Sequence, residues 1–169
     1  MNTTNLKFVD LTFYRDELLY DIKNYCYIES HVMEDDAEEA KHTVADVGET
    51  GNVDRVTRLL NLYFSEVVES LYPYTKTEIN KTTDSDVFTE PEKYEVHLSF
   101  PESMSITTVR LMRDLIHEFL VCMVVGDWLS ITNQKSSETW VEKGMYAKER
   151  LRSIVNSRGG VIRRKSHPF

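Results

Sequence analysis

The feature that most constrains the fold is an uninterrupted apolar run, residues 119–125 (FLVCMVV), within a longer helical pattern. A helix that is apolar on all sides has to be covered by other elements on every side. The run has seven residues, whereas a helix that crosses a membrane needs about twenty. We therefore expect residues 105–131 to form the central helix of a folded domain, with Ser105 or Thr107 as its N-cap.

Four further segments have the apolar spacing of amphipathic helices. They are residues 13–28 after an N-cap at Thr12, residues 33–47, residues 52–72 between Asn52 and Pro73, and residues 137–156. Residues 12–47 are compatible with one long helix or with two. Together with the central helix, these segments predict a mainly α fold, a bundle of four or five helices.

Residues 76–100 change from a helical period to that of a strand. Apolar and polar residues alternate there, as in a half-buried strand, with Tyr94, Val96, Leu98 and Phe100 on the apolar side. Residues 77–79 are its expected partner strand. We therefore expect a β-hairpin arm over about residues 76–100, inserted between the third and fourth helical patterns.

The composition favours one domain over residues 1–158, followed by a tail. The chain has 169 residues, of which 41% are hydrophobic and 28% charged, values typical of globular proteins. No apolar signal segment opens the sequence, so we expect a soluble protein made in a cytoplasm, with no membrane association. Cys26 and Cys122 lie in helical patterns and are expected to be buried free thiols.

Charge is distributed unevenly along the chain. Residues 1–50 hold four Lys/Arg and twelve Asp/Glu, whereas residues 148–169 hold seven Lys/Arg and one Asp/Glu. An acidic body repels the phosphates of duplex DNA and argues against a protein that wraps DNA. The basic end needs a separate explanation.

Sequence motifs for catalysis, metal binding and cofactor binding are missing. The sequence contains no Gly-x-Ser-x-Gly, phosphate-binding loop, dinucleotide fingerprint, Cys-x-x-Cys or His-Glu-x-x-His pattern. We therefore expect a non-enzymatic protein without catalytic residues, metal or cofactor. His117 is expected to be a structural histidine, and Asp127, Trp128 and Trp140 to pack a helical corner. An enzyme with a carboxylate metal site at Glu38, Glu39 and His42 is kept as an alternative.

The basic tail, residues 159–169, combines cations with apolar anchors. With the last residue of the preceding helix, its candidate binding residues are Arg158, Val161, Ile162, Arg163, Arg164, Lys165 and Phe169. The tail could be a solubilising end, a weak nucleic-acid contact or a segment that orders when it docks on a partner. The mixture of arginines with apolar residues favours docking.

Over about residues 50–169 the sequence resembles the head–tail connector (neck adaptor) proteins of tailed bacteriophages. The resemblance is carried by residues 53–62 (VDRVTRLLNL), 94–101 (YEVHLSFP), 117–129 (HEFLVCMVVGDWL) and 147–152 (AKERLR), followed by the basic tail. It is a likeness of pattern and order, without a diagnostic catalytic motif.

The resemblance implies a non-enzymatic protein of the virion neck that forms a ring of about twelve subunits. It implies that the tail docks on the portal protein, that the next neck or tail component binds elsewhere, and that DNA is only passing cargo. It also implies subunit contacts through the hairpin arm, at Tyr94, Val96, His97 and Leu98. The alternative is a cellular helical adaptor or regulatory domain that binds one protein partner.

Overall fold

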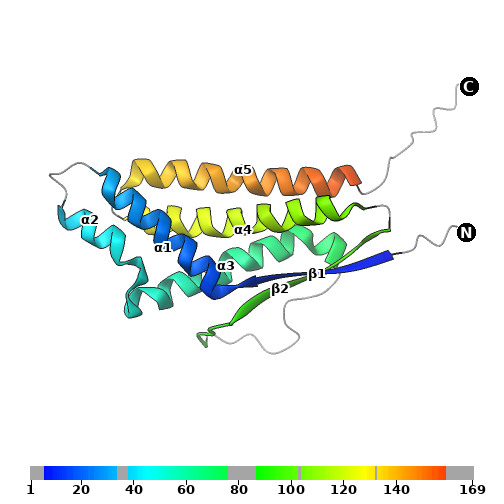
Figure 1. Ribbon diagram of the computed structural model, residues 1–169, viewed down its shortest axis with the longest axis horizontal. Helices are drawn as coiled ribbons and strands as arrows, with labels where there is room; N and C mark the ends of the chain where they lie inside the picture. The colour runs from blue at the N-terminus through cyan, green and yellow to red at the C-terminus, as the bar shows by residue number, and fades with distance from the viewer. Residues whose placement is uncertain (1–5, 34–37, 76–86, 103, 132, 159–169) are drawn as a thin grey trace, which may run out of the picture.

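The computed structural model describes residues 6–33, 38–75, 87–102, 104–131 and 133–158. The elements follow the order β1 (Leu6–Tyr14), α1 (Arg15–Val32), α2 (Glu38–Ala45), the 3-10 turn η2 (Asp46–Gly48), α3 (Thr50–Thr75), β2 (Lys93–Pro101), α4 (Ile106–Leu129) and α5 (Gln134–Arg158) (Figure 1). The expectation of a mainly helical fold with a small β element is confirmed.

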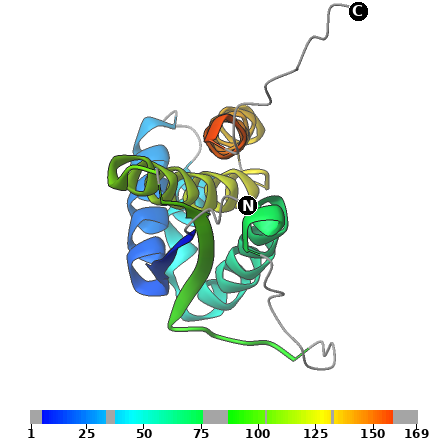
Figure 2. The ribbon, with the colours of Figure 1, turned by 90° about the vertical axis from the view of Figure 1, so that its right-hand side faces the viewer.

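Helix α4 is the central layer of the molecule, as its all-round apolar run predicts. Seen along the long axis in Figure 2, α5 covers one side of α4, the two strands and α3 lie on the other, and α1 lies along its flank. Every residue of the run 119–125 is buried. The N-cap is Ser105, whose side chain accepts a hydrogen bond from the backbone N–H of Thr108.

Two glycines allow α5 to lie close against α4. A Cβ at Gly126 would be 2.7 Å from Cγ2 of Val141, and one at Gly144 would be 2.9 Å from Sδ of Met123. The Ser137 hydroxyl donates to the carbonyl of Gly126 at 2.7 Å, which ties the start of α5 to the end of α4. Larger residues at either glycine would push the helices apart.

The two strands pair antiparallel, from Leu6 opposite Pro101 to Tyr14 opposite Lys93. The predicted strand after residue 92 is confirmed, with its apolar residues facing the core. Among the described residues, the strand that pairs with β2 is β1, three helices away in the chain. Residues 77–79 lie outside the described part of the chain. The β element is therefore a long-range pair of strands rather than a local hairpin arm.

Helix boundaries differ from the expected ones at two places. Thr12 lies within β1 opposite Glu95, so it is no N-cap, and the first helix begins at Arg15. Helix α3 continues through Pro73 to Thr75. Proline has a helical φ and lacks only its own N–H, so near a helix end it removes one hydrogen bond without stopping the helix at once.

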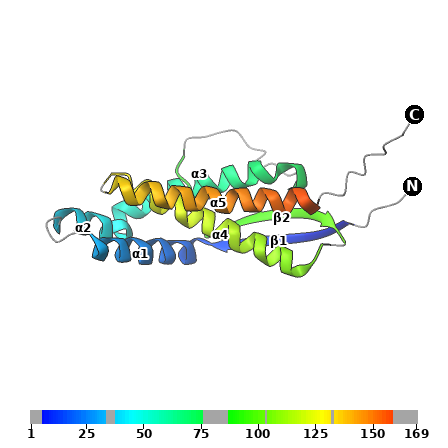
Figure 3. The ribbon, with the colours of Figure 1, turned by 90° about the horizontal axis from the view of Figure 1, so that it is seen from above.

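The segment expected as one helix or two contains two, α1 and α2, after the end of β1. α1 and α2 pack against each other, and residues 34–37 between them lie outside the described part of the chain. Val44 and Val47 bring the second helix and the following turn into the core. The beginning of β1 and the end of α5 lie at one end of an elongated molecule, and α2 lies at the other (Figures 1 and 3).

Candidate functional site

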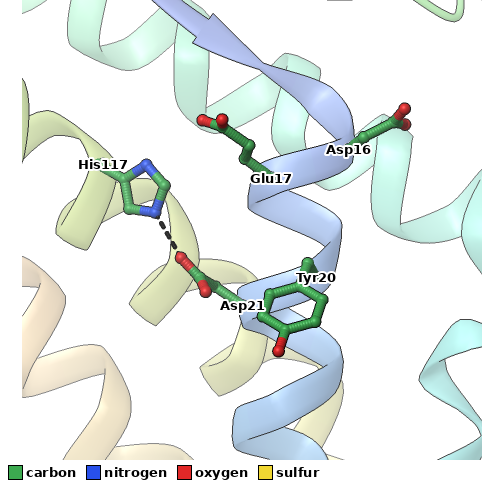
Figure 4. Close-up of a pocket in the computed structure, with 5 residues that line it drawn as sticks. All are labelled: Asp16, Glu17, Tyr20, Asp21 and His117. Carbon is green, nitrogen blue, oxygen red and sulfur yellow. Dashed lines mark hydrogen bonds and ion pairs between the residues drawn. The ribbon is translucent and has the colours of Figure 1, made fainter.

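An open pocket of about 430 Å³ lies between the first turns of α1 and the middle of α4 (Figure 4). Helix α1 supplies Asp16, Glu17, Tyr20 and Asp21, and α4 supplies His117. Spacings of three and four residues place Glu17, Tyr20 and Asp21 on neighbouring positions of one helix face. We call these five residues the acidic pocket, because three of them are carboxylic acids.

One hydrogen bond crosses the acidic pocket. Nε2 of His117 lies 2.7 Å from Oδ2 of Asp21, and the side chains are 30% and 39% exposed. Asp16 and Glu17 are exposed and form no ion pair with another described residue. Acids in the first turn are favourable at a helix N-terminus. The pocket therefore presents negative charge that the described protein leaves largely uncompensated.

The chemistry of the acidic pocket favours a cationic side chain as its ligand. Carboxylates accept several hydrogen bonds from a guanidinium or an ammonium group, and Tyr20 adds an aromatic surface. The described residues contain no group of three or more His, Cys, Asp or Glu close enough to hold a metal ion. The lining of the pocket is thus acidic and aromatic, a combination that can accept a cationic side chain.

A second hollow, between α3 and α5, differs in its charge. Its volume is about 650 Å³, and its lining includes Glu66, Glu69, Lys148 and Arg152. Nζ of Lys148 lies 2.7 Å from Oε2 of Glu66 and 5.0 Å from the centre of the Phe119 ring. Cations of the chain itself thus compensate the acids of this hollow.

The outer face of the sheet is apolar at one end. Along β1, Leu6 and Phe8 point away from the core and are 56% and 77% exposed. Further along the same face, Asp10 contacts His97 of β2, with 2.8 Å between Oδ1 and Nδ1. This face was not expected from the sequence.

Of the four expected subunit-contact residues on β2, three face the interior. Tyr94, Val96 and Leu98 are at most 4% exposed and pack within the chain's own core, where β2 lies against α3. The expectation that these three residues lie on a subunit-contact surface is therefore wrong for this chain, since their side chains are buried in its own core. His97 is exposed on the other face.

The expected docking segment falls mostly outside the described residues. Arg158 is the last residue of α5. The other expected docking residues, Val161, Ile162, Arg163, Arg164, Lys165 and Phe169, lie outside the described part of the chain.

The corner between α4 and α5 is built as expected. The Tyr63 hydroxyl donates to Oδ2 of Asp127, and Nε1 of Trp128 donates to the carbonyl of Val44 at 3.1 Å. Nε1 of Trp140 donates to Oε1 of Glu29 at 2.9 Å. Burial, followed by the hydrogen bond to Asp127, raises the pKa of Tyr63 far above its usual range. These polar groups hold elements of the fold together.

The two thiols are free and buried, as predicted. Burial raises the pKa of Cys26 to about 12, with a smaller contribution from Glu29. Burial also raises the pKa of Cys122 to about 12, with Glu118 nearby. A thiol that keeps its proton at neutral pH is a poor nucleophile, so neither cysteine is suited to nucleophilic chemistry.

The alternative metal site on α2 gains no support from its described part. Glu39 and His42 lie on α2, and no metal-binding group forms around them among the described residues. The side chain of Glu38 lies outside the described part of the structure.

The acidic pocket was missed by sequence reasoning. His117 was expected to be structural, and the acids of α1 were not singled out as candidate site residues. Asp21 and His117 are separated by almost a hundred residues, so no local spacing connects them. The one local signal was the group Asp16, Glu17, Tyr20 and Asp21 on consecutive turns of a helix.

Comparison with protein-family models, with curated proteins and with solved structures found no match. None of the helices in the described part of the chain has both the length and the apolar character that a membrane-crossing helix needs.

Proposed function

We propose that this chain is a non-enzymatic assembly protein of the head–tail connector kind. In this proposal it works as a homo-oligomeric ring of about twelve subunits in a virion neck. Its basic tail docks on a portal protein, and another surface receives the next neck or tail component. DNA passes through the ring without being bound specifically.

The observation that carries the proposal is the place where α5 ends, because the basic tail follows it in the sequence. The tail follows α5, whose last residue lies at one end of an elongated helical molecule, whereas α2 lies at the opposite end (Figure 1). Residues 159–169 contain three Lys/Arg and no Asp/Glu, while the whole chain has a net charge of −8. A cationic segment at one end can bind a partner on that side and leave the other end for a second component.

The charge of the body supports the same proposal. A ring with an acidic inner surface repels the phosphates of DNA, which prevents DNA from sticking while it passes. Weak docking by each tail is sufficient, because several tails on one ring bind with a high effective concentration.

The test is the native mass of the chain, alone and mixed with a portal protein encoded near its gene. We expect a complex with the portal that disappears when residues 159–169 are deleted, while circular dichroism of the deletion variant stays helical. A chain that remains a monomer with every neighbouring gene product would contradict the proposal and favour a cellular adaptor domain.

A further inference from the structure

β1 has one open edge. β2 pairs with one side of β1, and in the described residues no other strand pairs with the opposite side. Figure 3 shows the order β1, β2 and α3 across the molecule, so the open edge faces away from α3. An open edge presents unpaired N–H and C=O groups that can accept another strand.

The sequence of β1 does little to protect this edge. Its nine residues (LKFVDLTFY) contain no proline and only two charged side chains, Lys7 and Asp10. Natural edge strands usually avoid pairing through prolines, several charges, bulges or short length. Exposed Leu6 and Phe8 add apolar contact area on the adjoining face. β1 is therefore suited to strand addition by an extended peptide.

The acidic pocket continues this edge in space and in sequence. β1 ends at Tyr14, and the pocket begins two residues later at Asp16. Helix α1 runs on from β1 along the same side of the molecule (Figure 3). One extended segment can thus contact the open edge and the acidic pocket together, provided that it combines β-forming residues with cations.

Residues 159–169 of this chain have that chemistry. Val161 and Ile162 are β-branched, and Arg163, Arg164 and Lys165 follow them directly. We propose that the open edge of β1 and the acidic pocket form a receptor for residues 159–169 of a second copy of this chain. In the bound state, part of the tail pairs with β1, and its cations lie against Asp16, Glu17 and Asp21.

The reach of the tail identifies a second copy, rather than the same molecule, as its source. Lys143 of α5 pairs with Glu118, next to His117, at 2.7 Å, and lies fifteen residues before Arg158. At 1.5 Å per residue, the end of α5 is about 22 Å along the axis from this level. The seven residues from Arg158 to Lys165 span at most about 25 Å. Most of that length is used along the axis, so little backbone remains for a path around α4, whose diameter is about 10 Å, and this favours a second copy.

The inference goes beyond the proposed function, because it concerns free copies and needs no portal. A tail of one copy that binds the edge of the next makes a head-to-tail contact, in which the two copies use different surfaces. One tail cannot bind β1 of another copy and a portal at the same time, so the two contacts compete for it. The contact residues of the next copy are then on β1 and α1, in place of the interior residues Tyr94, Val96 and Leu98.

The test measures self-association of the purified full chain by sedimentation equilibrium at low salt. We expect self-association that weakens at 0.5 M salt. Salt screens the attraction between charges, and the distance over which they attract falls from about 10 Å at 0.1 M to about 3 Å at 1 M. Asp16→Lys with Glu17→Lys should weaken it by about tenfold, or about 1.4 kcal/mol. The tail variant Arg163→Glu, Arg164→Glu, Lys165→Glu should do the same. A chain that carries both the pocket substitutions and the tail substitutions should associate as the original does, because the charges are opposite again. A misfolded variant would not recover in this way.

A matched control changes the same amount of charge elsewhere. Glu69→Lys with Glu142→Lys, on exposed positions of α3 and α5, should leave self-association within about twofold of the original. Hydrogen exchange of the full chain should show that amides of β1 gain protection as concentration rises. Association without protection of β1, or without recovery in the charge-swapped chain, would overturn the proposal. A monomer at all concentrations would also overturn it.

The two proposals can fail separately. The variant Asp16→Lys with Glu17→Lys keeps its tail, so it should still bind a portal if the proposed function is right. If portal binding is lost when the tail is removed but kept in this variant, the proposed function is supported. This holds whether or not the chain self-associates without a portal. Self-association without portal binding supports only the receptor on β1.

Discussion

β1 and β2 have nine residues each and pair over their whole length, but they contribute differently to the fold. On β2, all four inward residues from Tyr94 to Phe100 are buried. On β1, the inward residues Lys7 and Val9 are only half-buried, and Leu6 and Phe8 are exposed on the outer face. The difference arises because β2 lies between β1 and α3, whereas β1 lies at the edge. β1 contributes to the core through Leu11 and Phe13 near its end, whereas β2 contributes along its length from Tyr94 to Phe100.

The largest expected effect is the loss of a buried side chain on β2. Leu98 is 1% exposed, so Leu98→Ala should lower the free energy of unfolding by about 2–5 kcal/mol. Phe8→Ala on β1 removes a larger side chain that is 77% exposed, and should change it by about 0.5 kcal/mol or less. Urea denaturation at low protein concentration measures both. Equal costs would show that the outer face of β1 is covered in solution.

A second prediction concerns the buried tyrosine of β2. The Tyr94 hydroxyl donates to Oδ1 of Asn61 at 2.7 Å, so Tyr94→Phe should cost about 0.5–1.5 kcal/mol at neutral pH. Burial raises the pKa of Tyr94 to about 12. In the unfolded chain a tyrosine ionises near pH 10. Above pH 10 ionisation therefore stabilises the unfolded original protein, but not the unfolded variant.

The stability gap between the original protein and Tyr94→Phe should consequently narrow as the pH rises from about 10 to 12. Denaturation at several pH values measures this gap, and all other ionisable groups are common to both proteins. Tyr14→Phe on β1 is the matched control at neutral pH, where its 55% exposure predicts only a small cost. A gap for Tyr94→Phe that stays constant up to pH 11.5 would contradict the buried environment of this phenol.

The same contrast explains which parts of the fold could be predicted from sequence. β2 alternates cleanly between apolar and polar residues, so its period was recognisable. β1 has apolar residues on both faces, Leu6 and Phe8 outward and Leu11 and Phe13 inward, which hides the period of two. Its segment after Thr12 was therefore interpreted as a helix start. A pairing across three helices leaves no local trace, so a nearby segment was expected as the partner of β2.

The helical part was easier to predict than the candidate receptor. The run 119–125 required a central helix, and the described structure has one. The acidic pocket depends on α1 and α4 coming together, which neither helix encodes by itself. In the sequence, residues 16–21 of α1 show only an acidic helix start. Their acids become a candidate binding site only because the structure places them beside His117 and the open edge of β1.

The smallest expected effect is on the outer face, where Asp10 and His97 form a cross-strand pair. Their side chains are 69% and 58% exposed, so water screens the interaction. A double-mutant cycle with Asp10→Asn and His97→Gln should give a coupling energy below about 0.5 kcal/mol. On the inner face, Leu11 lies opposite Val96, and a cycle of alanine substitutions there should give about 1 kcal/mol.

These two cycles compare opposite faces of one pair of strands, so differences in strand length and register cancel. The inner pair is buried, and its side chains contact each other without competing water. The coupling energy of the outer pair could approach that of the inner pair at high protein concentration and fall on dilution. That result would show that a second copy covers the outer face and excludes water from it. A small outer coupling at every concentration would place any neighbouring strand on the edge of β1 alone, clear of Asp10 and His97.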